Sequence, residues 1–170
     1  MPAAMTAATA PPLITAQREP QVPVEYGDIA VSPVYAAADL RIAPASPGKA
    51  ERLVPMLGHR GAVLYVNIEE AGLIARAEFS GAVAAAEGLL ALGAARVLVT
   101  DGGKACAEGT RAAGVISGTP PRVMVTRVTG AGDTFMAAHI VAERRGATRD
   151  AALDAAIRAA AVYVSGEVPT

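Results

Sequence analysis

The sequence predicts an α/β domain built on a mostly parallel sheet. Its 170 residues are enough for one domain with a hydrophobic core. Hydrophobic residues make up 52% of the chain and charged residues 18%, a balance typical of a folded interior rather than of a disordered chain. Short apolar runs alternate with alanine-rich helical stretches, and this alternation predicts helices on both faces of the sheet.

The chain divides into a leader and a domain. Residues 1 to about 25 are rich in Ala, Pro and Thr and are expected to form a flexible leader, and residues 26–170 form the domain. Strands are expected at 29–31, 40–43, 62–66, 96–100 and 123–125, with two antiparallel strands around 105–108 and 115–116. Helices are expected at 47–57, 68–74, 81–92, 135–145 and 149–164. Ser46 and Thr148 are the expected N-caps, and Gly93 is the expected stop of the third helix.

Charge and composition exclude several classes of function. The net charge of −1 gives no electrostatic attraction for nucleic acid. No apolar run approaches the ~20 residues of a membrane helix, and the N-terminus lacks the pattern of a secretory signal. The single cysteine, Cys106, cannot form an internal disulfide, which fits a reducing cytoplasm. We interpret Cys106 as a packed residue rather than a catalytic thiol.

The most informative segment is the turn Val128-Thr129-Gly130-Ala131-Gly132-Asp133-Thr134-Phe135, which leads into a helix. Small residues at a helix N-terminus let backbone N–H groups approach a phosphate closely. Asp133 falls in the first helical turn, where a carboxylate beside the anion can act as a base. These features suit transfer of a phosphoryl group to a hydroxyl. The alternative is a plain tight connection between a strand and a helix.

Two further segments follow expected strands. Asn67 and Glu70 are three residues apart and would share one face of a helical turn, where an amide and a carboxylate can hold hydrated Mg²⁺. The alternative is an Asn cap followed by a charged first turn. Thr100-Asp101-Gly102 ends the clearest strand, and its glycine would let the backbone approach a nucleotide. The alternative there is a plain β-turn.

Together these segments resemble the PfkB (ribokinase-like) carbohydrate kinases. The turn is similar to the family signature Asp-Thr-Thr-Gly-Ala-Gly-Asp-x-Phe, and Asn67–Glu70 and Thr100–Gly102 match the family's Asn-x-x-Glu and Thr-x-Gly. Residues 43–50 resemble Asp-Pro-x-Ser-Pro-x-Lys-Ala, with Ala43 in place of the aspartate. The resemblance implies a three-layer αβα ribokinase-like fold. It also implies transfer of the γ-phosphoryl group of ATP to a sugar or nucleoside hydroxyl. The motif Val-Thr-Gly-Ala-Gly-Asp is similar to that of pseudouridine-kinase-like members.

The resemblance also implies roles for individual residues. Asp133 would take the hydroxyl proton, and the backbone of Gly130, Ala131, Gly132 and Asp133 would stabilise the transferring phosphoryl group. Asn67 and Glu70 would place Mg²⁺ through water. The nucleotide would be flanked by Thr100, Gly102, Thr129, Ala160, Ser165 and Gly166.

The turn departs from the family at Arg127 and Val128, which replace Asp and Thr. The family's aspartate helps to hold an activating K⁺, and an arginine would repel that cation, so K⁺ activation is in doubt. The guanidinium could replace part of the cation's charge, but we expect it to point to solvent. His139 is interpreted as a packed or surface histidine, and residues 143–145 as a solvated helix end.

The resemblance covers residues 29–166, which correspond to the second half of a family member. The acceptor-binding signature and the β lid of the first half cannot be found in the chain. We therefore expect a truncated product, a split subunit whose partner chain supplies the missing half, or a rearranged relative; a homo-oligomer is a further possibility. The alternative functions are a non-catalytic nucleotide-binding or interaction module and a structural fragment that binds no nucleotide.

Overall fold

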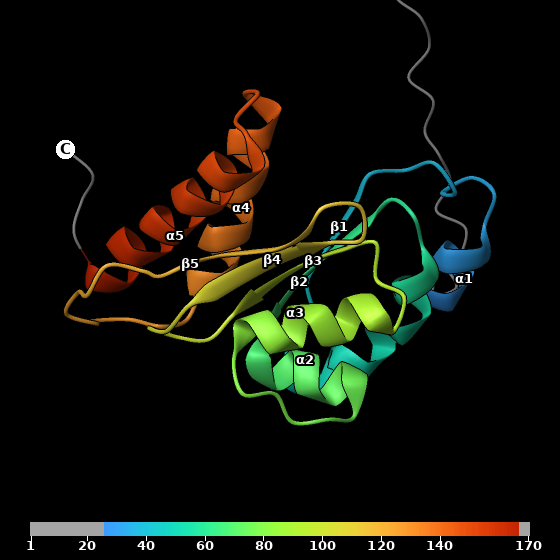
Figure 1. The fold of residues 1–170 in the computed structure, drawn as a ribbon, viewed down its shortest axis with the longest axis horizontal. Coiled ribbons are helices and arrows are strands. Elements are labelled where there is room, and N and C mark those ends of the chain that lie inside the picture. Colours follow the sequence, from blue (N-terminus) through green and yellow to red (C-terminus); the bar gives the residue numbers. More distant parts are fainter. Residues whose placement is uncertain (1–25, 167–170) are drawn as a thin grey trace, which may run out of the picture.

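The computed structural model describes residues 26–166, so the leader expected over residues 1–25 lies outside the described residues. Figure 1 shows helices on both sides of one sheet. The elements are α1 (Tyr26–Val31), β1 (Leu40–Ile42), the 3₁₀ helix η1 (Pro47–Gly58), β2 (Ala62–Asn67), α2 (Ile68–Ala75), α3 (Ala82–Ala91), β3 (Arg96–Thr100), β4 (Cys106–Thr110), β5 (Gly114–Gly118), α4 (Ala131–Arg144) and α5 (Arg149–Ser165).

The five strands lie in the sheet in chain order, β1-β2-β3-β4-β5. β1, β2 and β3 pair in parallel, with Leu64 opposite Val97 in the register of β2 and β3. β3 pairs with β4 and β4 with β5 in antiparallel fashion. The parallel pairing that the sequence predicts is therefore confined to the first three strands. The two antiparallel strands that follow are those expected around residues 105–108 and 115–116.

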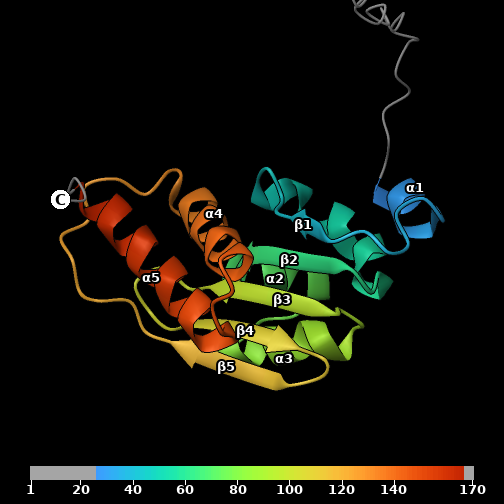
Figure 2. The same ribbon diagram turned by 90° about the horizontal axis from the view of Figure 1, so that it is seen from above.

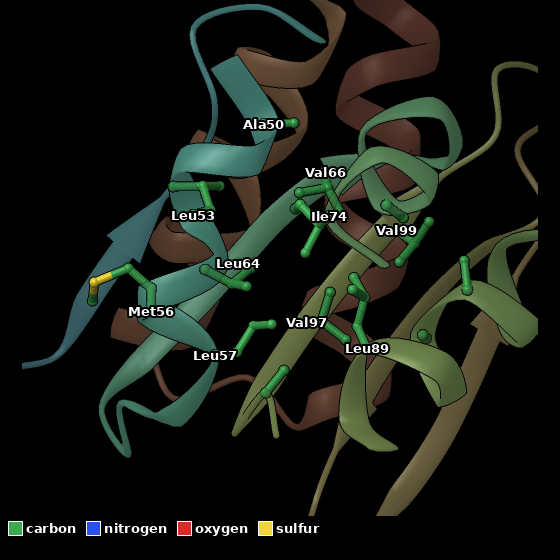
Figure 3. Close-up of a cluster of buried hydrophobic side chains, with 14 of the residues drawn as sticks. Ala50, Leu53, Met56, Leu57, Leu64, Val66, Ile74, Leu89, Val97 and Val99 are labelled. Atoms are coloured by element: carbon green, nitrogen blue, oxygen red, sulfur yellow. The ribbon is translucent and has the colours of Figure 1, made fainter. Parts of the chain in front are cut away.

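Side chains of the buried strands alternate between two cores, as the period of two in a strand requires. In β2, Leu64 and Val66 pack in the core beneath η1, α2 and α3, whereas Val63 and Tyr65 pack beneath α4 and α5. Figure 3 shows the first core, which is the larger of the two. Figure 2 shows α4 and α5 together on the other face of the sheet. The fold is therefore the three-layer αβα arrangement that the resemblance implies.

Two expected helix caps behave differently. Thr148 caps α5, because its side chain accepts a hydrogen bond from the backbone N–H of Ala151. Ser46 precedes η1, but its side chain makes no capping hydrogen bond; its backbone carbonyl accepts from the Lys49 N–H instead. Gly93 follows α3 at a φ of +115°, a conformation that glycine adopts without strain.

Two expected strands are wrong. Residues 29–31 lie in α1, where Tyr26, Ile29 and Ala30 share a helical face packed against the first core. Residues 123–125 form no strand, and the Met124 side chain is 82% exposed. The neighbouring Thr126 N–H donates to the Val164 carbonyl at 2.7 Å, so this segment is held by the end of α5 rather than by the sheet.

None of the helices among residues 26–166 combines the length and the apolar character needed to cross a membrane.

Candidate functional site

The carboxyl ends of β2 and β3 open into a cavity of about 820 Å³, which α4 and α5 border on one side. Open α/β sheets bind ligands at this edge because the strand ends and helix N-termini converge there. Most of the residues that the sequence singled out line the cavity: Asn67, Glu70, Thr100, Gly102, Ala131, Gly132, Asp133 and Ala160. Ala43 also lines it, so the missing aspartate of the 43–50 segment would have faced the cavity.

The glycine turn is shaped by Gly130, which has a left-handed φ of +92°. The turn closes through a hydrogen bond from the Ala131 N–H to the Val128 carbonyl at 3.0 Å. The Gly130 carbonyl in turn accepts from the backbone N–H and the hydroxyl of Thr134. The Ala131 N–H thus closes the turn in this structure, and its contact with an anion stays a prediction.

The next two donors of the turn are free to bind an anion. First-turn N–H groups have no acceptor inside their own helix, and within the described chain neither Gly132 nor Asp133 donates to a backbone carbonyl elsewhere. Both residues are exposed and line the cavity. The partial positive charge of the helix N-terminus adds to their attraction for an anion.

Asn67 and Glu70 form a capping box at the start of α2. The Asn67 side chain accepts from the Glu70 N–H, and the Glu70 carboxylate accepts from the Asn67 N–H, both at 2.8 Å. The simpler alternative, an Asn cap, is therefore present. Burial raises the pKa of Glu70, with the Asn67 hydrogen bond opposing it. One carboxylate oxygen of Glu70 is not used by the box, so a role in metal binding stays a prediction.

The remaining predicted site residues lie where the turn meets the end of α5 and do not line the cavity: Thr129, Gly130, Ser165 and Gly166. The Tyr163 hydroxyl donates to the Thr129 carbonyl at 2.8 Å. The Ser165 hydroxyl donates to the Val162 carbonyl within α5. The Tyr163 hydrogen bond places Thr129 in the support of the turn, and the contact of all four residues with a nucleotide stays a prediction.

Arg127 does not point freely into solvent as the sequence led us to expect. Its Nε donates to the Tyr163 carbonyl at 2.7 Å, and its guanidinium carbon lies 4.0 Å from the centroid of the Tyr163 ring. The side chain is exposed, yet it is fixed against the C-terminal end of α5.

Sequence reasoning missed several residues of the cavity wall: Tyr65, Leu98, Pro120, Pro121, Arg122, Phe135 and Ile157. Tyr65 and Leu98 could have been found, because alternation along β2 and β3 puts them on the α4–α5 face. Arg122 could not have been found, because it precedes residues 123–125, which were expected to form a buried strand and are irregular in the structure. Burial raises the pKa of the Cys106 thiol, which also lines the cavity, to about 11. This favours the interpretation of Cys106 as a packed residue.

A second polar cluster, on β4 and the C-terminal half of α4, is buried rather than open. His139 is fully buried, with Nδ1 2.9 Å from the Tyr65 hydroxyl and Nε2 3.4 Å from the Glu108 carboxylate. Glu108, also fully buried, pairs with Arg96 at 2.6 Å and with Arg149 at 3.1 Å. His139 is thus a packed histidine, as expected.

The expected solvated end at residues 143–145 is wrong for Glu143. Its carboxylate pairs with Arg96 at 2.6 Å and with Arg41, and its side chain is only 19% exposed. The sequence could not show this, because both arginines come from strands far away in the chain. Arg144 extends the same network to Asp39 at 2.9 Å.

The fold and the cavity define a class of protein: an αβα domain with a glycine turn that lines a cavity at the carboxyl ends of parallel strands. The model of the pfkB family of carbohydrate kinases matches residues 37–168, and the chain belongs to this family. A comparison with curated proteins found no match.

Solved structures of sugar kinases share the fold. A carbohydrate kinase from Agrobacterium tumefaciens is 26% identical, with a TM-score of 0.62 over 79% of this chain and 43% of that one. Ribokinase from Thermotoga maritima is 26% identical, with a TM-score of 0.61 over 74% and 42%. Arabidopsis thaliana ribokinase, solved with ribose and ATP, is 28% identical, with a TM-score of 0.58 over 65% and 36%. The chain spans 40–44% of the length of three further kinase-family structures that it matches.

Proposed function

We propose that this chain carries the nucleotide-binding and catalytic half of an ATP-dependent phosphotransferase that acts on a hydroxyl of a sugar or nucleoside. The main support for the proposal is that most of the predicted site residues converge on one cavity. The free donors of the turn, the Asp133 carboxylate, and the Asn67–Glu70 and Thr100–Gly102 segments all border it. Membership of the pfkB family supports the same reaction class.

The cavity fits a phosphate-bearing ligand on the side of the turn. A Cβ built on Gly132 would have no neighbour within 4 Å, so a large anion has room to approach the backbone there. The Gly132 and Asp133 N–H groups have no other acceptor among residues 26–166 and can donate to phosphate oxygens. Thr100 and Gly102 also line the cavity, and the rest of a nucleotide would lie against them.

The residues present also fit a hydrated Mg²⁺, held through few protein ligands. Glu70 keeps one carboxylate oxygen outside the capping box, and the Asn67 amide oxygen keeps a second lone pair. Within the described chain no three His, Cys, Asp or Glu side chains are grouped to hold a metal. Mg²⁺ commonly keeps several waters and binds substrate phosphates, so a single carboxylate and an amide suffice.

In the proposed reaction the acceptor hydroxyl attacks the γ-phosphorus of ATP. The new P–O bond to the acceptor forms as the bond to the β,γ-bridging oxygen breaks, ADP leaves with that electron pair, and Asp133 takes the hydroxyl proton. The Gly132 and Asp133 N–H groups stabilise the charge of the transferring phosphoryl group.

A second candidate function is a non-catalytic nucleotide-binding or interaction module. It is favoured by the limited coverage of the related kinases, because this chain covers only 40% and 44% of the length of two of them. In a split arrangement a second chain or a second copy would supply them. Kinase activity that appears only on mixing with such a partner would support the split enzyme over the module.

Calorimetric titration with a non-hydrolysable ATP analogue and Mg²⁺ tests nucleotide binding. We expect Gly132→Val to weaken binding by more than about tenfold, because the new side chain occupies the space before the turn without meeting any protein atom. Gly48→Val is the matched control, since Gly48 is exposed, equally free of neighbours and outside the cavity. Equal binding by all three proteins, or no binding by the folded wild type, would overturn the proposal.

The role of Asp133 is tested by Asp133→Asn in a phosphoryl-transfer assay over a panel of sugars and nucleosides. Loss of a general base lowers the rate by about 10²- to 10⁴-fold, whereas the neutral amide leaves the N–H donors in place. We therefore expect transfer to fall by at least about a hundredfold with nucleotide affinity within about twofold. Parallel loss of binding and transfer would identify Asp133 as a structural residue instead.

A further inference from the structure

The last carbonyls of α5 accept hydrogen bonds from residues 126 and 127, which lead into the glycine turn. The Val164 carbonyl accepts from the Thr126 N–H at 2.7 Å and from the Thr126 hydroxyl at 3.1 Å. The Tyr163 carbonyl accepts from the Gly166 N–H at 3.3 Å and from Arg127 Nε at 2.7 Å. Carbonyls at a helix C-terminus carry a partial negative charge and are stabilised by a cation.

Arg127 supplies a cation at this position. Its guanidinium binds the Tyr163 carbonyl through Nε and lies over the ring of the same tyrosine at 4.0 Å. A guanidinium over an aromatic face gains cation–π attraction in addition to the hydrogen bond. One residue therefore neutralises the helix end and fixes the backbone that begins the turn.

Tyr163 links this cation to the turn itself. Its hydroxyl donates to the Thr129 carbonyl at 2.8 Å, one residue before Gly130. A Cβ on Gly130 would lie 2.5 Å from that hydroxyl, and a Cβ on Gly166 would lie 2.8 Å from the Thr126 hydroxyl oxygen. Both glycines also have a left-handed φ. The turn and the helix end thus interlock with no room for a larger side chain at either contact.

From this arrangement we infer that Arg127 is a positioning residue that acts as the built-in cation of the site. It holds residues 126–130, which lead into and begin the glycine turn, against α5. Nucleotide binding therefore needs no added monovalent cation. The inference rests on the proposed function, because it concerns the turn that would bind the phosphates. The guanidinium already binds the Tyr163 carbonyl at the helix end, where a cation is favoured, so a residue of the chain takes the place proposed for K⁺.

The first test measures affinity for the non-hydrolysable ATP analogue with Mg²⁺ in potassium chloride and in tetramethylammonium chloride at equal ionic strength. We expect the wild-type dissociation constant to differ by less than about twofold between the two salts. In tetramethylammonium, Arg127→Gln should bind about fivefold more weakly, the size of effect that a cation has at a helix C-terminus. Potassium should restore part of that loss, because a free ion can then approach the Tyr163 carbonyl.

Three variants separate positioning from general charge or folding effects. Arg127→Lys keeps the charge and should retain most of the affinity. Arg52→Gln removes a charge from an exposed arginine outside the cavity and should bind as the wild type does. Tyr163→Phe removes the hydrogen bond to Thr129 but keeps the ring under the guanidinium, and should weaken binding less than Arg127→Gln. Wild-type binding that requires potassium, or wild-type affinity in Arg127→Gln, would overturn the inference.

Amide hydrogen exchange without nucleotide distinguishes failure of the inference from failure of the proposed function. If Arg127 holds the turn, Arg127→Gln should speed exchange of the Thr126 and Arg127 amides, which donate to Val164, by about fivefold. Exchange at β3 should not change. If the chain does not bind nucleotide but Arg127→Gln exchanges faster, the proposed function is wrong and the positioning role of Arg127 is supported. If exchange is unchanged, Arg127 does not hold the turn.

Discussion

The residues at the two ends of α4 lie in opposite environments. At the N-terminal end, Gly132 and Asp133 are exposed and face a cavity, and Asp133 makes no ion pair within residues 26–166. Towards the C-terminal end, His139 is fully buried and Glu143 is paired with two arginines. Asp133 and Glu143 are separated by roughly 15 Å of helix at the usual rise per residue.

The difference identifies which of these residues serve structure. A buried charge must find its partners within the chain, because its transfer from water is costly. Glu108, His139 and Glu143 have such partners, so we assign them to the fold even though histidine and glutamate are common catalytic residues. A ligand site, in contrast, needs donors and carboxylates that the protein leaves unused, as it does at Asp133.

The largest effect on stability is expected from Glu108→Gln. The substitution removes the buried carboxylate that binds Arg96, Arg149 and His139, and leaves the arginines without that counter-charge. We expect a loss of about 3 kcal/mol in the free energy of unfolding, measured by urea denaturation. Glu87→Gln on exposed α3 surface should stay within about 0.5 kcal/mol of the wild type. A similar small change for Glu108→Gln would contradict the structural role of the buried cluster.

An intermediate effect is expected from the paired substitutions Gly130→Ala and Gly132→Ala. Alanine at 130 must adopt a φ of +92° and place its Cβ 2.5 Å from the Tyr163 hydroxyl, so a loss of about 2 kcal/mol is expected. A Cβ at position 132 would have no protein atom within 4 Å. Gly132→Ala should therefore raise the free energy of unfolding by about 0.5 kcal/mol, because alanine favours the first turn of α4. Thermal unfolding of both variants checks the difference, and equal effects would show that the turn is not held as described.

The smallest effect is expected from pH. For Glu143, burial raises the pKa, but hydrogen bonds and charges from Arg41, Arg96 and His139 outweigh it and hold the pKa below 4.5. Because the folded pKa lies below the unfolded value, the carboxylate stabilises the fold above that unfolded value. This contribution is lost as the pH falls through the folded pKa.

The measurement compares urea unfolding of the wild type and Glu143→Gln at pH 7 and at pH 3. We expect a difference of about 1 kcal/mol at pH 7 that shrinks in acid. A constant difference between the wild type and Glu143→Gln at both pH values would contradict the pairing of Glu143 with the arginines.

Local sequence signals predicted most elements and several of the residues that line the cavity. Apolar runs in 62–66 and 96–100 located β2 and β3, and Thr148 and Asn67 marked helix starts through hydrogen bonds to residues three positions away. Residues 123–125 misled the prediction because an apolar run has strand character only where a neighbouring strand can pair with it. The environment of Glu143 was missed because its partners, Arg41 and Arg96, are distant in the chain.

The family, the position of the glycine turn and the candidate base could be recognised in the sequence, because they depend on residue types at fixed short spacings. The use that the fold makes of those residues became clear only from the packing of distant segments. The tertiary structure brought Asn67, Thr100 and Asp133 to one cavity, committed Asn67 and Glu70 to a capping box, and placed Arg127 on the end of α5. These outcomes depend on contacts between segments far apart in the chain, whose geometry is set by the packing of α4 and α5 on the sheet.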